Sequence, residues 1–227
     1  MKILAVRIGD RYGPEYEEYL QSKLPDADFI WIREAIQDNI MLQWNKIAGM
    51  NLDINQPLCV MDIDILLTNN YMELFEYPIK HGQFLHAPNW WRGDSAGKWK
   101  VNGGFYKYYP KDCKYIYDKF MATPEYWQSK YILDGTTTGP VNGEQHFIEE
   151  AANERLEVIS LPDAWFCRME SRESERYYIS ASNRLYKEKT GNDYMFLGGE
   201  FHPDIKFVHF TNMDNLPKNW KHYKLFV

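Results

Sequence analysis

Two carboxylates one residue apart, Asp62 and Asp64, stand inside the apolar run 58–67. Four apolar residues precede the pair and three follow it, which predicts a buried strand with charge at its end. Side chains at i and i+2 of a strand point the same way, so we expect both carboxylates to face one site. Adjacent buried carboxylates repel each other, so a cation or a donor network is expected there. The alternative is a strand that ends at the surface with solvated acids.

This acidic pair is compatible with two classes of enzyme. In the first, Mg²⁺ or Mn²⁺ held by oxygen ligands bridges the phosphates of a nucleoside diphosphate and assists transfer of the attached group. In the second, a phosphotransferase of the haloacid-dehalogenase type, Asp62 would be the nucleophile. That class expects the motif on the first strand and Thr or Val at the position of Leu66, so the sequence favours the first class.

Strands alternate with helices along most of the chain, which predicts one α/β domain over residues 1–227. A first strand at 2–8 leads into a glycine-containing turn at 9–13, an opening typical of nucleotide-binding folds, although no phosphate-loop motif is present. The other expected strands lie at 29–32, 83–87, 101–108, 156–161, 164–169 and 206–210. Helices are expected after Pro14, before Gly49, and at 111–122, 124–133 and 143–152, with irregular helix and loop at 171–199.

Two further features can be interpreted without a role in catalysis. Lys46 falls opposite much of the apolar stripe of its helix, and this spacing alone predicts a solvated lysine. Residues 88–100 carry Trp90, Trp91 and Trp99 with two glycines, which indicates an aromatic-lined surface loop. The alternative for this loop is that its rings fold back and cover the core.

Composition narrows the class of protein. The net charge of −6 over 227 residues and the lack of a basic block argue against a nucleic-acid partner. Seventeen Tyr, 12 Phe and 8 Trp provide flat rings that suit carbohydrate faces. The three cysteines, at positions 59, 113 and 167, lie far apart and indicate reduced thiols. No transmembrane segment is expected, since no apolar run approaches about 18 residues, and a cytoplasmic protein is predicted.

In their order along the chain, these motifs resemble the metal-dependent glycosyltransferases of the GT-A fold, in particular the glycogenin and lipopolysaccharide galactosyltransferase group. The resemblance implies a Rossmann-like, mixed and mostly parallel sheet flanked by helices. The matching motifs are the opening strand with its turn 9–14, Trp44-x-Lys46, Asp62-Ile63-Asp64, Asn102-Gly103-Gly104, Gly143-Glu144-Gln145, His209-Phe210 and Lys218-x-Trp220.

The resemblance also implies site residues. The metal ligands would be Asp62, Asp64 and His209, and an imidazole beside two carboxylates favours Mn²⁺ over Mg²⁺. Asp64, Gln145 and Lys218 would be catalytic, with Lys218 gripping the leaving diphosphate. The donor-binding residues would be Arg7, Gly9, Tyr12, Lys46, Asp62, Asn102, Gly103, Glu144, Gln145 and Lys218.

The resemblance implies transfer of a hexose from a nucleotide sugar, UDP-linked and with retention, to a glycan, lipid-linked or protein acceptor. Two departures from the family stand out. Lys218 lies further from His209 than in the family, and Glu144 replaces an Asp, which lengthens that side chain by one methylene. A non-catalytic carbohydrate- or nucleotide-binding module of the same fold is the other interpretation.

Overall fold

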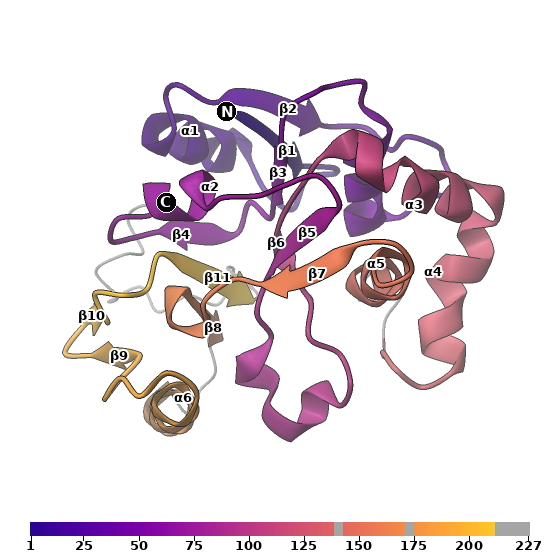
Figure 1. The fold of residues 1–227 in the computed structure, drawn as a ribbon. Coiled ribbons are helices and arrows are strands. Elements are labelled where there is room, and N and C mark those ends of the chain that lie inside the picture. Colours follow the sequence, from indigo (N-terminus) through magenta and orange to yellow (C-terminus); the bar gives the residue numbers. More distant parts are fainter. Residues whose placement is uncertain (139–142, 171–174, 212–227) are drawn as a thin grey trace.

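The computed structural model describes residues 1–138, 143–170 and 175–211, with side chains described except at 94–96, 170, 175–180 and 211. A six-stranded sheet in the order β2-β1-β3-β6-β5-β7 forms the centre of this part (Figure 1). β1 pairs in parallel with β2 and β3, and β5 with β7, whereas β6 runs antiparallel to β3 and β5. The strands are β1 (Lys2–Val6), β2 (Asp28–Ile32), β3 (Leu58–Met61), β5 (Gln83–Ala87), β6 (Asn102–Tyr108) and β7 (Glu157–Ser160).

A second sheet has the order β4-β11-β8, with β4 at Ile65–Leu67, β8 at Phe166–Glu170 and β11 at Phe207–Thr211. β11 runs antiparallel to β4 and parallel to β8. A two-stranded hairpin, β9 (Phe196–Leu197) with β10 (Glu200–Phe201), follows the last of the described helices. The mixed, mostly parallel architecture confirms the predicted α/β class.

The prediction of one strand over 58–67 is wrong, because the chain changes sheets in its middle. β3 ends at Met61 and β4 begins at Ile65 in the other sheet. The amide of Asp62 still bonds to the Gly104 carbonyl beside β3, whereas the Asp64 carbonyl accepts from the amide of Phe210 on β11. Asp62 and Asp64 therefore stand in the bend between the two sheets.

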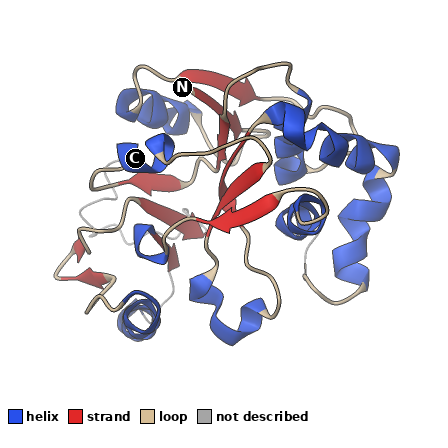
Figure 2. Ribbon diagram, in the orientation of Figure 1, coloured by secondary structure: helices blue, strands red, loops and turns tan. Residues whose placement is uncertain are grey.

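Helices cover both faces of the central sheet (Figure 2). Ile3 and Ala5 of β1 belong to the apolar cluster on the α1 side, while Leu4 belongs to the cluster beneath η1, α3 and α5, as expected for side chains that alternate across a sheet. The helices are α1 (Pro14–Lys23), η1 (Leu42–Asn51), α2 (Met72–Glu76), η2 (Trp90–Ala96), α3 (Pro110–Ala122), α4 (Pro124–Leu133), α5 (Glu144–Ala152), η4 (Asp163–Trp165) and α6 (Glu175–Thr190).

Within 171–199, where irregular helix and loop were predicted, residues 175–190 form the regular helix α6. Buried Tyr186 holds this helix in place: its hydroxyl donates to the carbonyl of Ala164 at 2.8 Å, and its ring lies 5.4 Å from that of Trp90. This long-range packing stabilises a segment whose own sequence is strongly polar.

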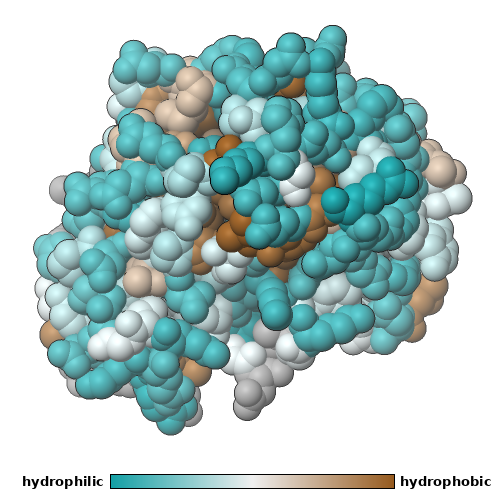
Figure 3. Space-filling model, in the orientation of Figure 1, coloured by the Kyte–Doolittle hydropathy of each residue, from teal (hydrophilic) through white to brown (hydrophobic). Residues whose placement is uncertain are grey.

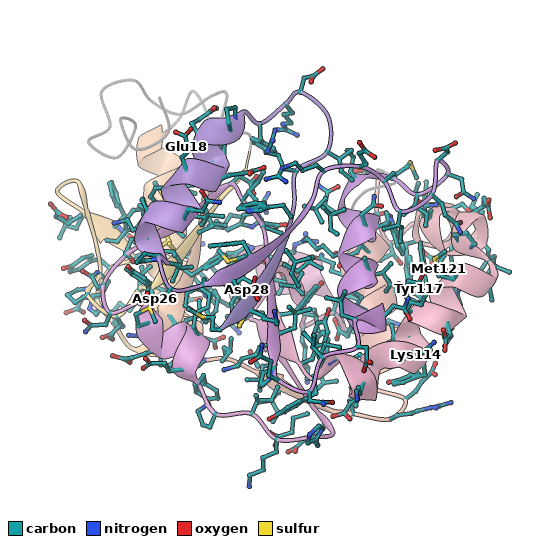
Figure 4. All side chains as sticks on the ribbon, turned by 90° about the horizontal axis from the view of Figure 1, so that it is seen from above. Glu18, Asp26, Asp28, Lys114, Tyr117 and Met121 are labelled. Atoms are coloured by element: carbon teal, nitrogen blue, oxygen red, sulfur yellow. The ribbon has the colours of Figure 1, made fainter. Side chains whose placement is uncertain are left out.

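The face of the molecule seen in Figure 3 is mostly hydrophilic, with an apolar area near its centre. From above, Glu18 of α1 and Lys114 of α3 lie on the outer sides of their helices (Figure 4). Among the described residues, none of the helices has the length and apolar character needed to cross a membrane.

Candidate active site

Asp62, Asp64 and His209 converge where the two sheets meet. His209 stands opposite Ile65 in the β11–β4 pair, one residue beyond Asp64. Its Nε2 lies 3.3 Å from Oδ2 of Asp62 and 3.4 Å from Oδ1 of Asp64. One ligand atom from each residue lies within 4.8 Å of the others. The carboxylates thus share a site, but through a bend between sheets rather than through the alternation of one strand.

The three side chains fit a divalent cation. They are between 16% and 18% exposed, which leaves room on the cavity side for a ligand. Two carboxylates and one imidazole supply the oxygen and nitrogen donors that such ions take. Burial raises the pKa of Asp64, but hydrogen bonds with His209 and Tyr12 outweigh it and hold that pKa below its ordinary value. The Asp64 carboxylate is therefore anionic at neutral pH, as a metal ligand would need to be.

Tyr12 contacts this cluster directly. Its hydroxyl donates to Oδ2 of Asp64 at 2.9 Å. Burial and the neighbouring Asp64 charge raise the pKa of Tyr12, so it remains a hydrogen-bond donor. Arg7, on the same side of the cavity, pairs through Nε with Glu17 of α1 at 2.5 Å. These contacts fix both side chains beside the cluster of Asp62, Asp64 and His209.

Lys46 is buried, so its interpretation as a solvated lysine is wrong. Its side chain is 3% exposed, and its ammonium pairs with Oδ1 of Asp62 at 2.5 Å and donates to the Gly103 carbonyl at 2.7 Å. Burial lowers the pKa of Lys46, but Asp62 and Glu144 outweigh it and raise that pKa above the ordinary value. The Lys46 ammonium is therefore a cation at neutral pH and lies beside the cluster of Asp62, Asp64 and His209.

The glycine pair at the start of β6 permits close packing around Lys46. The amide of Gly103 donates to Oε1 of Gln145 at 3.0 Å, and that of Gly104 donates to Oδ1 of Asn102 at 2.9 Å. A Cβ at Gly103 would lie 3.1 Å from Oε2 of Glu144, and one at Gly104 would lie 2.9 Å from Oδ1 of Asn102. Larger residues would push these polar side chains out of place.

Glu144 and Gln145, at the start of α5, present two buried atoms without a hydrogen-bond partner among the described residues. These atoms are Oε1 of Glu144 and Nε2 of Gln145. Glu144 is 3% exposed; burial raises its pKa to about 7, with Lys46 opposing the shift and Asp62 adding to it. An acceptor and a donor side by side suit a ligand rich in hydroxyl groups, because buried polar atoms are normally satisfied.

One cavity of about 470 Å³ joins these residues. Of the predicted site residues that the structure describes, all except Gly9 line it. Gly9 is exposed, and its φ of +78° shows that glycine is needed there for the turn. Lys218 lies outside the described residues.

The cavity also contains residues that the sequence did not indicate: Arg11, Gln43, Arg92 and Arg168. Arg168 reaches the cavity because β8 pairs with β11 and places it directly beside His209. The sequence does not give the order of the strands, so this pairing could not be predicted from it.

Part of the segment 88–100 covers the core instead of forming an open loop. Trp90 is buried, and its Nε1 donates to the Phe166 carbonyl at 3.1 Å. Trp99 packs against His146 with ring centroids 4.4 Å apart. At the end of the segment, the carboxylate of Glu149 accepts from the amides of Lys100 and Val101 at 2.9 to 3.0 Å. For Trp90, the alternative of a core-covering ring is correct.

No protein-family profile matches this chain, and no curated protein matches it by sequence. Solved structures do match. The galactosyltransferase LgtC, in complex with donor and acceptor sugar analogs, superposes with a TM-score of 0.54 and 9% identity over 99% of this chain and 92% of its own. Glycosyltransferase GlyE of Streptococcus pneumoniae TIGR4 gives 0.55 and 11% over 96% of this chain and 56% of its own.

Mouse xyloside xylosyltransferase 1 gives a TM-score of 0.50 and 13% identity, covering 95% of this chain and 86% of its own. This chain therefore has the GT-A glycosyltransferase fold, which confirms the fold expected from the resemblance. It spans little more than half the length of the GlyE structure.

Proposed function

We propose that this protein is a metal-dependent glycosyltransferase that moves a hexose from a UDP-sugar to an acceptor. The observation that carries the proposal is the convergence of Asp62, Asp64 and His209 in the same cavity as Glu144 and Gln145. The GT-A fold supports it, since the matching structures are named as enzymes that transfer sugars.

Asp62, Asp64 and His209 would hold the divalent cation, and the imidazole favours Mn²⁺ over Mg²⁺. The chemistry that such a cation supplies is Lewis-acid stabilisation of the departing diphosphate. Lys46 orients Asp62 through its 2.5 Å ion pair and adds a positive charge at the same place. In this proposal Lys218 also binds the diphosphate.

The other site residues would bind different parts of the nucleotide-sugar donor. Arg7 and Tyr12, at the end of β1, would bind the nucleobase. Glu144 and Gln145 would bind the sugar hydroxyls through the two atoms that have no partner among the described residues. Because Oε1 of Gln145 is held by the Gly103 amide, its Nε2 is the atom directed to the sugar. We propose retention at the anomeric carbon on the basis of the resemblance.

The phosphotransferase alternative is not favoured. A nucleophilic Asp62 would need an unencumbered oxygen, but its two oxygens face Lys46 and His209. The fold also matches glycosyltransferases. The other alternative, a non-catalytic binding module of this fold, would have the same cavity and would differ only in lacking sugar transfer.

We also propose a cytoplasmic location. Cys59, Cys113 and Cys167 are all buried free thiols, and burial raises the pKa of each. This arrangement suits a reducing compartment.

The test is a panel of nucleotide sugars, each measured by thermal shift with and without Mn²⁺, followed by assays of donor hydrolysis. We expect Mn²⁺-dependent stabilisation by at least one UDP-hexose and slow release of UDP from it. Stabilisation without any release, even with acceptors, would indicate the binding module. No shift with any donor would contradict the proposal.

A further inference from the structure

Glu17 of α1 is a buried carboxylate to which the proposed function gives no role. It is 7% exposed and lies outside the lining of the cavity. Its Oε1 accepts from Nε of Arg7 at 2.5 Å and from Nε of Arg33 at 3.1 Å, and its Oε2 accepts from Nη2 of Arg33 at 2.6 Å. Burial raises the pKa of Glu17, but these hydrogen bonds outweigh it and hold that pKa below its ordinary value. Glu17 is therefore anionic at neutral pH.

The register of β1 with β2 brings the two arginines to this carboxylate. Val6 stands opposite Ile32 in the parallel pair, and the amide of Arg7 donates to the Ile32 carbonyl at 2.9 Å. Arg7 and Arg33 are the next residues of the two strands. Their side chains therefore project from the same face of the sheet, which is the face that α1 covers.

α1 holds Glu17 firmly against this face. The hydroxyl of Tyr19 accepts from the amide of Leu67 on β4 at 2.9 Å, and Leu20 is fully buried. Glu17 thus stands on a helix that is packed against the sheet on both sides of its position, by Tyr16 and by Leu20. A carboxylate on such a helix restricts the movement of the side chains that pair with it.

Arg7 carries this restriction into the cavity. It lines the cavity, whereas Arg33 lies outside the lining and its side chain is 54% exposed. Arg7 also donates through Nη1 to the Tyr12 carbonyl at 3.4 Å. Because Nε and Nη1 point in different directions, these two contacts fix the plane of the guanidinium group. Glu17 offsets the charge of Arg7, so what Arg7 offers a ligand is a fixed orientation.

Resting on the proposed function, in which Arg7 binds the nucleobase, we propose that Glu17 is a positioning residue that holds the Arg7 guanidinium in the orientation that meets a uracil ring. A guanidinium group can donate to a carbonyl oxygen of the ring or stack on its face. When its orientation is set before binding, less side-chain entropy is lost on binding. The effect of Glu17 should therefore be confined to the nucleobase end of the donor.

The test is calorimetric titration of the full chain with UDP without metal, with Mn²⁺ alone, and with pyrophosphate in the presence of Mn²⁺. Glu17→Met keeps the length of the side chain and removes its acceptor atoms. We expect it to weaken UDP binding about three- to tenfold, which corresponds to the ordering of one long side chain. The dissociation constants of the other two probes should stay within about twofold, because those probes bind elsewhere in the cavity.

A double-mutant cycle separates positioning from a loss of packing. In an Arg7→Met background, Glu17→Met should change UDP affinity by less than about twofold, because the side chain through which Glu17 acts is gone. Glu17→Gln, which keeps an acceptor and loses the charge, should give a smaller loss. It carries the same cycle if the methionine variant does not fold, which circular dichroism establishes.

Two matched controls lie beside the network. Arg33→Gln removes the exposed partner of the same carboxylate and leaves Arg7 paired. Glu18→Met changes the next, exposed residue of α1 (Figure 4). Both variants should bind UDP as wild type does.

Three results would overturn the inference alone. They are wild-type UDP affinity in both Glu17 variants, a loss that persists unchanged in the Arg7→Met background, and an equal loss of affinity for pyrophosphate with Mn²⁺. The second would mark a packing role, and the third would assign Arg7 to the diphosphate. Wild-type protein that does not bind UDP, with or without Mn²⁺, would instead overturn the proposed function.

Discussion

The hydroxyl of Tyr12 donates a hydrogen bond of 2.9 Å to Oδ2 of Asp64, although 52 residues separate them in sequence. This contact joins the turn after β1 to the bend between β3 and β4. A residue that the resemblance assigns to the nucleobase therefore also orients Asp64, a proposed metal ligand. Nucleotide binding and metal binding are expected to be coupled through it.

Replacing Tyr12 with Phe should weaken Mn²⁺ binding about tenfold, the usual effect of removing a residue that orients a metal ligand. Stacking on the ring should survive, so UDP binding in the absence of metal should not change. Calorimetric titrations with Mn²⁺ and with UDP separate the two effects. The control is Tyr115→Phe, which removes a hydroxyl bonded to the Ala151 carbonyl away from the cavity. Equal loss of both affinities would show that Tyr12 does not act through Asp64.

Replacing Lys46 with Met should remove Mn²⁺-dependent UDP binding and lower the free energy of unfolding by about 1–3 kcal/mol, since Asp62 loses its partner but keeps some solvent contact. Urea denaturation and calorimetry measure the two effects. Lys107→Met is a matched control, because the buried Lys107 ammonium donates instead to the carbonyls of Phe75 and Tyr77. That variant should lose stability and keep UDP affinity; a K46M variant with wild-type affinity would contradict the assignment.

Glu144 makes stability depend on pH. Its pKa is about 7 in the folded chain against an ordinary 4.5, so the folded state holds the proton more tightly. The resulting stabilisation is fully present below about pH 4.5 and is lost as pH rises through about 7. Wild-type protein should lose roughly 1–3 kcal/mol from this group between pH 5 and 8, and Glu144→Gln should not.

Urea denaturation at both pH values checks this difference. Glu18→Gln, at an exposed position of α1, is the control and should behave as wild type (Figure 4). The same pH dependence in the Glu144 variant would show that another group is responsible.

Glu149 fixes the end of the segment 88–100 by accepting the amides of Lys100 and Val101. Replacing Glu149 with Ala leaves both donors unpaired, and we expect a loss of about 1–3 kcal/mol. Trypsin should then cleave faster after exposed Lys98 and Lys100. The control is Glu150→Ala, at the next residue of α5, whose carboxylate pairs with Lys130. This variant should not accelerate the cleavage. Unchanged cleavage in the Glu149 variant would show that the segment is held elsewhere.

Local patterns predicted the order of the elements well, because periodicity and turn residues act within short windows. Helix α3 begins one residue before its predicted start and α4 has the predicted bounds. The prediction of one strand over 58–67 failed because apolar side chains are buried in either sheet. Nothing in the residue types marks the change of sheet at Asp62. The bounds and regularity of α6 were not predicted, because its stability comes from packing on distant residues such as Ala164.

The sequence indicated site residues at positions where a polar side chain interrupts an apolar segment. Asp62 and His209 occupy two such positions, and the structure brings them together. For Lys46, the spacing of residues along the helix did not predict burial. Its side chain is buried because it contacts Asp62 and Gly103, and only the fold brings these residues together. Arg168 carries no local signal, because arginines are common outside active sites and only the pairing of β8 with β11 places this one beside His209.

The most direct test of the central claim is calorimetric titration of Mn²⁺ and UDP into wild-type protein and the Asp64→Asn variant. Asn keeps the size of the side chain and removes the charge that the cation needs. The account predicts that UDP binds wild-type protein more tightly with Mn²⁺ than without it, and that the variant loses this dependence. Mn²⁺-dependent UDP binding of equal strength in both proteins would contradict it.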